Sequence, residues 1–385
     1  MERIRIAFFG PTNSGKSTLV NAIAGQQVSL VSDIPGTTTD PVRKAIELPG
    51  IGPCVLIDTA GLDDTGVLGP ERQRLTRAVL DETDIAVVLP MAPNEVHWAQ
   101  KGGQNAPNGS DIEPLATRAG IPVIHYTRGE SVASLLQRIQ EALPKEEEQF
   151  LTGDLVKAGD TVLLVMPQDS EAPKGRLILP QVQVLRELLD RKCNALCCTP
   201  ESLPDAMKSL RTPPALTITD SQVFGLVNQC IPQEWPLTSF SILLANAKGD
   251  IRTFVEGAKA IDRLDGHSRV LIAEACTHVP DTEDIGRVKI PALLRKRIKM
   301  AGQAGHDEGP TVQIAAGNDF PEDLTPYDLI IHCGACVAGK QVVRSRTKKA
   351  LLNGVPITNY GIALAFLQGI LGRIVIPGPA SRTEG

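Results

Sequence analysis

Residues 3–17 decide the fold of the amino-terminal part of the chain, and they read RIRIAFFGPTNSGKS. The apolar run up to Phe9 is typical of a buried strand, and the pattern G-x-x-x-x-G-K-S begins directly after it at Gly10. A helical run, residues 18–25, follows the pattern. Strand, glycine-rich loop and helix in this order characterise a phosphate-binding P-loop and predict a parallel α/β domain.

The P-loop predicts how a nucleotide and its metal ion are held. Backbone N–H groups of the loop would surround the β-phosphate, Lys16 would reach the β- and γ-phosphate oxygens, and Ser17 would bind Mg²⁺. The residues that we expect to contact the nucleotide in this segment are Gly10, Asn13, Ser14, Gly15, Lys16, Ser17 and Thr18.

Two further motifs follow in the order found in GTPases. Residues 33–40 (DIPGTTTD) resemble a switch I segment, in which Thr38 would bind Mg²⁺ and the γ-phosphate. Residues 55–61 (VLIDTAG) resemble a strand with switch II, in which Asp58 would bind a Mg²⁺ water and the Gly61 N–H would contact the γ-phosphate. The three motifs resemble the translation-factor-like GTPases, especially the tRNA-modifying and Era-type proteins. We therefore expect GTP hydrolysis, with Lys16, Thr38, Asp58 and Gly61 as the catalytic residues.

Two positions in this domain bear on how hydrolysis is catalysed. Leu62 stands where Ras-like enzymes carry the glutamine that orients the attacking water. Asn13 matches the P-loop asparagine with which potassium-activated members of the resembled group bind K⁺, a cation that can take the place of an arginine finger. Hydrolysis must therefore use an arrangement without that glutamine.

The guanine-reading motif N-K-x-D is absent from the whole chain. Residues 91–120 are polar and rich in Gly, Asn and Pro, and we expect a loop where the strand ending in that motif would lie. Residues 121–126 then read as the last strand of the domain and residues 131–143 as its helix. The sequence predicts phosphate binding and leaves selectivity for guanine open.

The composition is that of an ordinary α/β protein without a strong charge bias. In 385 residues, 39 Lys and Arg stand against 44 Asp and Glu, a net charge of −5, and 42% of the residues are hydrophobic. This balance offers no general attraction to nucleic acid or anionic lipid, and no apolar run is long enough to span a bilayer. The eight cysteines are unevenly spaced, and the P-loop is a motif of cytosolic proteins. Both observations favour reduced thiols over a set of disulfides. We expect a cytoplasmic protein that binds neither membrane nor nucleic acid.

A charged segment, residues 144–149, ends the first predicted domain, residues 1–145. Beyond it, strand-like runs alternate with a helix predicted at 180–190, and they predict a second parallel α/β domain over residues 151–265. These runs cover residues 160–166, 194–199, 216–219 and 238–244. Neighbouring strand positions face opposite sides of a sheet, so Cys193, Cys197 and Cys198 cannot all bind one metal ion. Together with Cys54 and Cys230, they are predicted to be structural.

The last predicted domain, residues 266–385, carries two short cysteine–histidine motifs. Cys276-Thr-His278 follows the strand-like residues 270–275, and His332-Cys333-Gly-Ala-Cys336 follows the strand-like residues 328–331. The carboxyl ends of parallel strands meet at one edge of a sheet, where such sheets place their binding sites. We therefore expect three thiols and two imidazoles to come together at that edge.

These ligands fit two kinds of metal site. Three thiolates can hold a [4Fe–4S] cluster whose fourth iron is left to a histidine, a water or an incoming group. At most one of His278 and His332 would bind that iron, and the other would orient a ligand. A closed Cys₃His zinc site uses the same residue types, so the residues alone leave cluster and zinc as alternatives.

The three predicted domains together resemble the [FeFe]-hydrogenase maturation GTPases, the HydF family. The resemblance rests on the P-loop domain, the middle α/β domain and a last domain with C-x-H, 53 further residues and H-C-x-x-C. It extends to residues 172–180, 282–291 and 358–361. It implies that Cys276, Cys333 and Cys336 hold a [4Fe–4S] cluster, and that the middle domain forms a homodimer.

The resemblance also implies a function and partners. Members of this family act as scaffolds or carriers for a di-iron precursor with CO and cyanide ligands. They receive it from two radical-SAM maturases and deliver it to the hydrogenase apoprotein. The alternative is a P-loop GTPase that modifies RNA and contains a structural zinc ion. The predicted fold is α/β, a P-loop GTPase-like domain followed by two further α/β domains.

Overall fold

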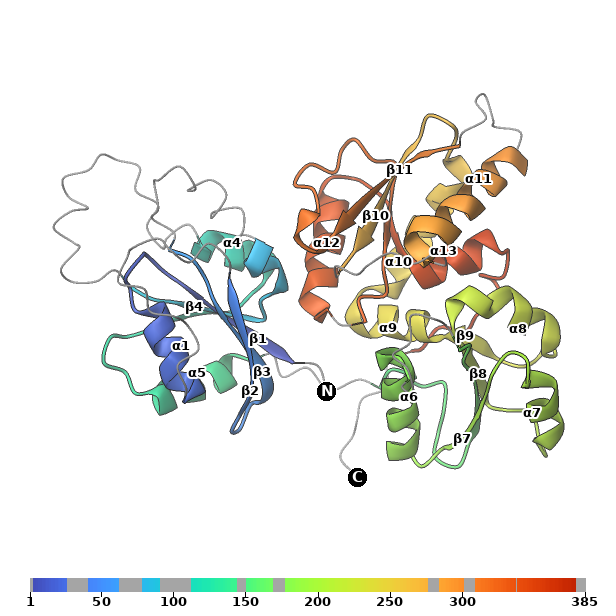
Figure 1. Ribbon diagram of the computed structural model, residues 1–385, viewed down its shortest axis with the longest axis horizontal. Helices are drawn as coiled ribbons and strands as arrows, with labels where there is room; N and C mark the ends of the chain where they lie inside the picture. The colour runs from blue at the N-terminus through green and yellow to red at the C-terminus, as the bar shows by residue number, and fades with distance from the viewer. Residues whose placement is uncertain are drawn as a thin grey trace. The chain divides into compact units, whose positions relative to one another are not determined.

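The computed structural model describes residues 3–25, 41–61, 78–90, 112–143, 150–168, 177–275, 284–300, 309–336 and 338–378. In these residues the chain forms three β-sheets with helices on their faces (Figure 1). The chain divides into two compact units, residues 1–146 and 147–385. The first unit contains one sheet and the second contains two, so the predicted α/β class is confirmed.

The sheet of the first unit has the strand order β2-β3-β1-β4-β5. Its strands are β1 (Ile4–Phe9), β2 (Val42–Leu48), β3 (Gly52–Asp58), β4 (Ile85–Val88) and β5 (Val123–His125). All neighbours are parallel except β2, which is antiparallel to β3. The central strand β1 pairs Phe8 with Asp58 of β3 and with Val87 of β4, so the carboxyl ends of these three strands share one edge.

Helices cover both faces of this sheet because successive residues of β1 point to opposite sides. Ile6 and Phe8 pack under α1 (Lys16–Ala24) and α5 (Val132–Ala142). Ala7 and Phe9 pack under α4 (Ile112–Ala119). Each side of the sheet therefore has its own apolar core, and the P-loop connects β1 to the first helix.

The predicted strand at 121–126 and the helix at 131–143 are confirmed as β5 and α5. Ser131 begins α5 as its amino-terminal cap, because its hydroxyl accepts a hydrogen bond from the Ser134 N–H. The loop predicted over residues 91–120 is wrong at α4. Ile112 and Ala116 lie four residues apart, so one helical turn buries both against the sheet despite the polar composition. Residues 91–111 lie outside the described residues.

The middle sheet is parallel throughout and has the order β7-β6-β8-β9. Its strands are β6 (Thr161–Val165), β7 (Asn194–Cys198), β8 (Leu216–Thr219) and β9 (Leu237–Ser239). The helices between and after them are α6 (Leu179–Asp190), α7 (Leu203–Ser209), η2 (Ser221–Val223), α8 (Phe224–Cys230) and α9 (Phe240–Lys248).

The strand predicted over residues 238–244 is shorter than expected. It ends at Ser239, whose hydroxyl accepts a hydrogen bond from the Ile242 N–H and so begins α9. The apolar run after Ser239 is buried on several sides, and a short run of this kind does not distinguish a strand from a buried helix. The last residue of α9, Lys248, reaches the cysteine motif.

The third sheet is also parallel and has the order β11-β10-β12-β13. Its strands are β10 (Arg269–Glu274), β11 (Thr311–Ala316), β12 (Leu329–His332) and β13 (Ile357–Asn359). Its helices are α10 (Ile251–Ala258), η3 (Lys259–Arg263), η4 (Ile285–Lys289), α11 (Ile290–Met300), η5 (Gly317–Asp319), α12 (Lys340–Leu352) and α13 (Tyr360–Leu367). The cysteine motifs follow β10 and β12, which are neighbours.

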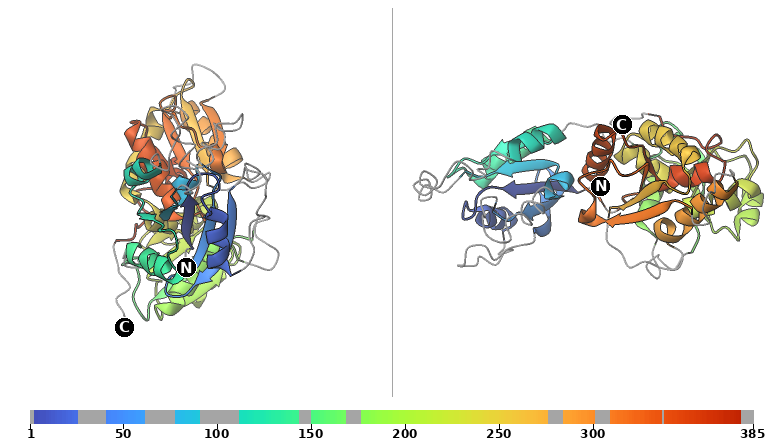
Figure 2. Two further views of the ribbon diagram at one scale, coloured as in Figure 1. Left: turned by 90° about the vertical axis from the view of Figure 1, so that its left-hand side faces the viewer. Right: turned by 90° about the horizontal axis from the view of Figure 1, so that it is seen from above.

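The middle and third sheets share one continuous apolar core. Leu163 of β6 and Ile272 of β10 belong to the same buried cluster, and α9 contributes Ile242 to it. Figure 1 shows α9 beside strands and helices of both sheets, and Figure 2 shows the chain from two further sides. The end of the chain adds a second connection, since Ile374 bridges to Leu237 of β9. The domain limits 1–145, 151–265 and 266–385 stay predictions.

Among the described residues, none of the helices combines the length and the apolar character needed to cross a membrane.

Candidate functional sites

The P-loop joins the carboxyl end of β1 to the first turn of α1. Its backbone needs the left-handed region, with φ of 153° at Gly10, 59° at Asn13 and 94° at Gly15. A Cβ atom at Gly10 would lie 2.8 Å from the carbonyl oxygen of Leu89, the residue after β4, so glycine is also required there for this close approach. The loop therefore has the local geometry that its sequence pattern predicts.

Lys16 lies inside the loop rather than in solvent, with 7% of its surface exposed. Its ammonium group donates hydrogen bonds to the carbonyl oxygens of Gly10 at 2.9 Å and Pro11 at 2.6 Å. The amino group is thus positioned where the loop curls, at the start of α1. This position fits the predicted role of Lys16 as the cation that binds phosphate oxygens.

Ser17 and Asp58 bring the P-loop and β3 together. The Ser17 hydroxyl donates a hydrogen bond of 2.6 Å to Oδ2 of Asp58, although the two residues are 41 positions apart. A hydroxyl and a carboxylate are hard oxygen donors, and Mg²⁺ prefers such donors in nucleotide sites. The residues present therefore fit Mg²⁺, and the structure brings Ser17 and Asp58 into direct contact.

Gly61 lies directly against the P-loop. A Cβ atom at Gly61 would lie 2.1 Å from Oγ1 and 2.7 Å from the backbone nitrogen of Thr12. Thr59, two residues before Gly61, is held in place as well, because its hydroxyl donates a hydrogen bond of 2.7 Å to the Phe8 carbonyl oxygen. The start of the predicted switch II motif thus adjoins the phosphate loop. Thr38 and Leu62 lie outside the described residues.

The second site lies at the carboxyl edge of the third sheet. There β10 and β12 are parallel neighbours, with Ala273 opposite His332. The carboxyl ends of these two strands therefore meet at one edge, as predicted. The Cys333 N–H donates to the Ala273 carbonyl oxygen at 2.9 Å, which continues the strand pairing into the H-C-x-x-C motif. The Cys333 sulfur in turn accepts hydrogen bonds from the N–H groups of Ala275 at 3.1 Å and Ala335 at 3.4 Å.

These contacts bring the residue before the first cysteine motif to the second motif. Ala275 immediately precedes Cys276, so the chain that enters the C-x-H motif touches the Cys333 sulfur. Cys276 and His278 themselves lie outside the described residues, while Cys336 is partly exposed in the same loop as Cys333. Backbone N–H groups directed at a sulfur stabilise a metal-bound thiolate. The chemistry of this edge therefore fits a thiolate-bound metal group.

No group of three Cys, His, Asp or Glu side chains with metal-binding geometry occurs within the described ranges of the chain. The third predicted thiolate, Cys276, is outside them. Of the other cysteines, Cys54 and Cys193 are buried, as expected of structural residues, Cys198 is partly buried, and Cys197 and Cys230 are exposed.

His332 has hydrogen-bond partners at both ring nitrogens. Nδ1 lies 2.7 Å from the Cys333 carbonyl oxygen, and Nε2 lies 3.3 Å from the Arg346 guanidinium. Because guanidinium only donates, Nε2 is the acceptor and Nδ1 carries the proton. Burial and the Arg346 charge lower the pKa of His332 to about 3, so the ring is neutral. This arrangement favours an orienting role over iron binding for His332.

Arg346 connects the ends of three strands. From α12 it donates hydrogen bonds to the carbonyl oxygens of Glu274 at 3.0 Å and Gly317 at 2.5 Å, besides its contact with His332. Its guanidinium also lies 4.7 Å above the centre of the Phe320 ring. Nothing in the sequence marks Arg346 for this role, because it is one of several basic residues in the same helix.

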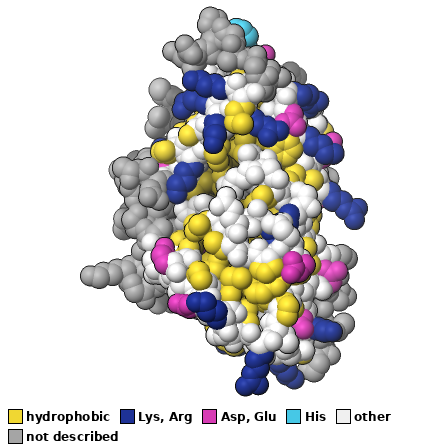
Figure 3. Space-filling model, turned by 90° about the vertical axis from the view of Figure 1, so that its right-hand side faces the viewer, with side chains coloured by type: hydrophobic (Ala, Val, Ile, Leu, Met, Phe, Trp, Pro, Cys, Tyr) yellow, Lys and Arg dark blue, Asp and Glu magenta, His cyan; other side chains and the backbone are white. Residues whose placement is uncertain are grey.

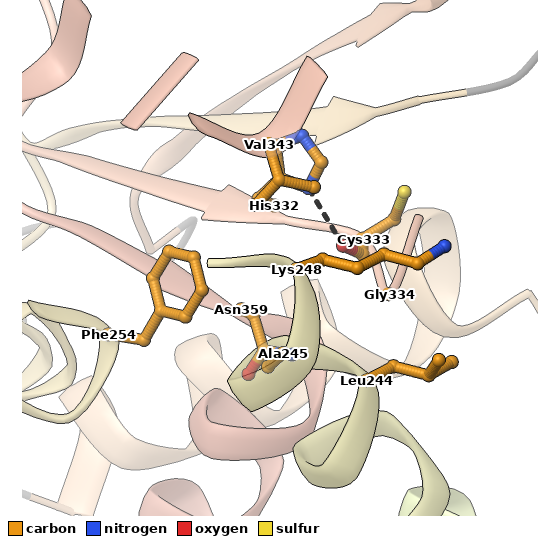
Figure 4. A pocket seen from close by; sticks show the side chains of 9 residues that line it. All are labelled: Leu244, Ala245, Lys248, Phe254, His332, Cys333, Gly334, Val343 and Asn359. Carbon is orange, nitrogen blue, oxygen red and sulfur yellow. Dashed lines mark hydrogen bonds between the residues drawn. The ribbon is translucent and has the colours of Figure 1, made fainter. Parts of the chain in front are cut away.

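A small pocket opens beside the H-C-x-x-C motif (Figure 4). Its lining comes from helices of both neighbouring sheets and from the motif itself: Leu244, Ala245, Lys248, Phe254, His332, Cys333, Gly334, Val343 and Asn359. Figure 4 shows the Lys248 side chain running past Cys333 toward Gly334. Lys248, at the end of α9, is a second residue whose place at this edge no sequence motif indicates.

An ion pair lies at the end of β10, next to the cysteine motifs. Glu274, which is two residues before Cys276 and buried, binds the Arg287 guanidinium at 2.8 Å. Asp284 accepts a hydrogen bond from the Arg287 N–H at 2.8 Å and so begins η4. The chain is thus anchored on both sides of residues 276–283.

The fold and the phosphate loop define the first unit as a P-loop domain of the GTPase type. Comparison with family models agrees, since residues 5–124 match the 50S ribosome-binding GTPase family. Residues 151–249 match the hydrogen maturase F dimerization domain, and residues 252–377 match the hydrogen maturase F tetramerization domain. The last two models together cover more than half of the chain. The chain belongs to the hydrogen maturase F (HydF) family, and it contains a GTPase domain.

Individual relatives resemble mainly the first unit. The tRNA modification GTPase MnmE of Methylobacterium sp. (strain 4-46) is 36% identical over 156 residues, 37% of this chain and 34% of that protein. MnmE of a Thermus thermophilus strain is 31% identical over 216 residues, 50% of this chain and 49% of that protein. The chain thus spans between about a third and a half of the length of these two relatives.

Two solved structures are similar to part of the chain at low identity. An Aquifex aeolicus Era variant bound to GDP and aluminium fluoride is 18% identical, with a TM-score of 0.27, over 54% of this chain and 98% of that one. An S. thermophilus NFeoB variant with the same ligands is 19% identical, with a TM-score of 0.22, over 37% of this chain and 65% of that one.

Proposed function

We propose that this protein is a GTP-dependent maturation factor for [FeFe]-hydrogenase that holds a [4Fe–4S] cluster at the edge formed by β10 and β12. The observation that carries the proposal is the 3.1 Å hydrogen bond from the Ala275 N–H to the Cys333 sulfur. It connects the residue before the C-x-H motif to the H-C-x-x-C motif. Membership of the hydrogen maturase F family supports the same function.

In this proposal the nucleotide site works as a switch. Lys16 exchanges the carbonyl oxygens of Gly10 and Pro11 for oxygens of the β- and γ-phosphates. Ser17 and Thr38 bind Mg²⁺, and Asp58 binds a water of that ion. The Gly61 N–H contacts the γ-phosphate, so hydrolysis releases the segment that follows it.

Asn13 is the residue that we propose for K⁺. Its exposed position and left-handed backbone at the rim of the P-loop support this assignment. The other residues proposed to contact the nucleotide are Gly10, Ser14, Gly15 and Thr18. A K⁺-dependent rate of GTP hydrolysis that disappears in Asn13→Ala, with unchanged binding of GDP, is the expected result. Equal rates in Na⁺ and K⁺ would contradict it.

At the other site Cys276, Cys333 and Cys336 are the proposed cluster ligands. Three thiolates leave one iron with an exchangeable ligand, and this iron supplies the position at which a di-iron precursor is received and released. The neutral ring of His332, bound to Arg346 and to the Cys333 carbonyl, orients the loop without binding the metal itself. His278 is then the histidine left as a candidate for the fourth iron.

Oligomerisation of the second unit is supported by both family models. We propose that residues 151–265 form a homodimer through β7, which is the end strand of the middle sheet. The adjacent helix α6 exposes Leu179, Val182 and Leu189. An exposed strand edge beside exposed apolar side chains can continue into the same strand of a second copy. Deletion of residues 1–150 should leave a dimer, and a monomer at micromolar concentration would contradict this.

A further apolar area lies on another face of the second unit. Figure 3 shows hydrophobic side chains gathered on one face, with Lys, Arg, Asp and Glu side chains around them. Leu226 of α8 and Val288 of η4 are exposed apolar residues of this unit. Areas of this kind suit contacts with other proteins. The proposed partners are two radical-SAM maturases, which supply the precursor, and the hydrogenase apoprotein, which receives it.

The experiment that tests the proposed function is anaerobic reconstitution of the full chain with iron and sulfide. A broad brown absorption that dithionite bleaches supports the cluster. Replacement of Cys333 by Ala should lose most of the iron, whereas Cys197→Ala, at an exposed thiol of β7, should keep it. A colourless protein with one zinc ion per chain would overturn the proposal and favour an RNA-modifying GTPase with a structural zinc site.

Selectivity for guanine is a separate expectation. Without N-K-x-D, the preference for GTP over ATP should be smaller than in a site built to hydrogen-bond the guanine edge, where discrimination reaches several powers of ten. Competition of ATP against a fluorescent GTP analogue measures this preference. Complete exclusion of ATP would show that residues 91–111 read the base in another way.

A further inference from the structure

Lys248 is the last residue of α9 and lies under the H-C-x-x-C motif. Only 8% of its surface is exposed. Its ammonium group donates hydrogen bonds to the carbonyl oxygens of Ala335 at 2.6 Å, Ala338 at 2.8 Å and Cys336 at 3.4 Å. The helix that carries Lys248 precedes this loop by almost ninety residues, so the contact depends on the packing of the two sheets.

The chemistry of these contacts is that of a buried cation. An ammonium group has three N–H donors, and here three backbone carbonyl oxygens accept from it. These hydrogen bonds fix the position of the ammonium group and of its charge. A charge in such surroundings acts over a longer distance than one in water, because little solvent lies between it and its neighbours. The loop that it contacts carries the two cysteines of the motif.

The loop itself has a backbone that needs support. Ala335 has φ of 49°, in the left-handed region that side chains other than glycine rarely adopt. In this conformation its N–H donates to the Cys333 sulfur at 3.4 Å, while its carbonyl oxygen accepts the shortest of the Lys248 hydrogen bonds. Lys248 therefore holds the residue whose strained backbone directs an N–H group at a predicted ligand.

We propose that Lys248 is a positioning residue of the metal site, which holds the Cys333–Cys336 loop and raises the reduction potential of the group bound there. This inference rests on the proposed [4Fe–4S] cluster. A cluster with three thiolates is anionic, and reduction adds one more negative charge. A fixed positive charge under the loop stabilises the reduced form more than the oxidised form, so the potential rises.

Lys248 and the cysteine loop that it contacts belong to two different segments of the chain. It lies at the end of the segment matched by the dimerization model, whereas the loop belongs to the segment matched by the tetramerization model. A movement of α9 would shift the ammonium group relative to the cysteines.

The test compares full-length wild type with Lys248→Met and Lys248→Gln after anaerobic reconstitution. Lys259→Met is the matched control, because Lys259 is an exposed lysine of the same unit, paired with Glu256. Lys248→Arg restores a cation. Iron and sulfide content are measured first, then the reduction potential by a redox titration followed by electron paramagnetic resonance. Circular dichroism establishes that each variant is folded.

We expect the equilibrium constant for reduction to fall about tenfold or more in the two charge-free variants, a shift of about 59 mV to lower potential for one electron. Lys248→Arg should stay closer to wild type, and Lys259→Met should equal it. Loss of iron in Lys248→Met together with retention in Lys248→Arg also supports the proposal. Folded Lys248→Met and Lys248→Gln with wild-type iron content and potential would overturn it.

This result is distinguishable from failure of the proposed function. If wild-type protein takes up no [4Fe–4S] cluster, the proposed function fails and this inference fails with it. If wild type holds the cluster and the Lys248 variants match it, only the role of Lys248 is contradicted.

Discussion

The two candidate sites occupy equivalent places, at the carboxyl ends of neighbouring parallel strands, but they are assembled differently. At the nucleotide site, Lys16 binds carbonyl oxygens of residues five and six positions earlier. At the cysteine site, Lys248 binds carbonyl oxygens 87 to 90 positions away, and Arg346 binds one 72 positions away. One site is shaped largely by a continuous loop, and the other by side chains from several helices.

This difference has consequences for how each site responds to change. A loop that makes its site from backbone N–H groups tolerates substitution of most side chains but not of its glycines and its lysine. A site supported by buried Lys and Arg depends on the packing of α9 and α12 against the sheet. Local changes should therefore disable the first site, while distant changes should disable the second.

The largest effect is expected for Lys16→Ala. It removes charge-assisted hydrogen bonds to the phosphates, worth about 3–6 kcal/mol for two such bonds, so nucleotide affinity should fall more than a hundredfold. Titration of the protein with a fluorescent GTP analogue measures this. Arg118→Ala, at an exposed arginine of α4, is the control. Iron uptake by Lys16→Ala should match wild type, and its loss would show that the two sites are not independent.

A smaller effect is expected for Arg346→Met. The substitution leaves the carbonyl oxygens of Glu274 and Gly317 without this donor in a buried region, and we expect a loss of about 3 kcal/mol in the free energy of unfolding. Urea denaturation of metal-free protein measures it. Arg344→Met, at an exposed arginine of the same helix, should change it by less than about 0.5 kcal/mol. Equal stabilities of the two variants would contradict the bracing role of Arg346.

Gly61→Ala should act on catalysis more than on folding. The added Cβ would meet the backbone of Thr12 at 2.7 Å, so the P-loop and the switch segment must separate. We expect GTP hydrolysis to slow by about tenfold or more, which corresponds to about 1.4 kcal/mol. The release of phosphate under saturating GTP measures it. Gly372→Ala places its Cβ in open space and serves as the control. An unchanged rate of GTP hydrolysis in Gly61→Ala would rule out a close contact between Gly61 and Thr12 during turnover.

The smallest effect concerns a structural thiol of the first sheet. Burial raises the pKa of Cys54 to about 11, above the value of about 8.5 for a free thiol. The thiolate forms more readily in the unfolded chain, so this contribution to stability is complete below about pH 8.5 and is lost as pH rises toward about 11. Between pH 8 and 9.5 the loss is about 1 kcal/mol.

Cys54→Ala should remove that part of the pH dependence, whatever its effect on absolute stability, and Cys230→Ala, at an exposed thiol, should retain it. Urea denaturation at the two pH values measures how the free energy of unfolding changes with pH. The same slope in Cys54→Ala as in wild type would mean that the thiol titrates normally in the folded protein.

Local motifs made much of this protein predictable from its sequence. The P-loop, the Asp58 and Gly61 positions and the two cysteine motifs all follow strands, and parallel pairing brings the strand ends together. The errors also have local causes. Residues 112–119 form α4 because two apolar side chains suffice for one buried turn, and the run after Ser239 is helical because burial on several sides hides its period.

The sequence by itself determined the residues that can bind phosphate and sulfur-seeking metals, because those functions need particular side chains and glycines at fixed spacing. Only the tertiary structure decided which residues support them. Lys248 and Arg346 look like ordinary members of helices until packing removes them from solvent and turns each toward backbone carbonyl oxygens. His332 is turned toward Arg346 for the same reason. Burial against distant segments is a property of the folded chain, so no spacing in the sequence records it.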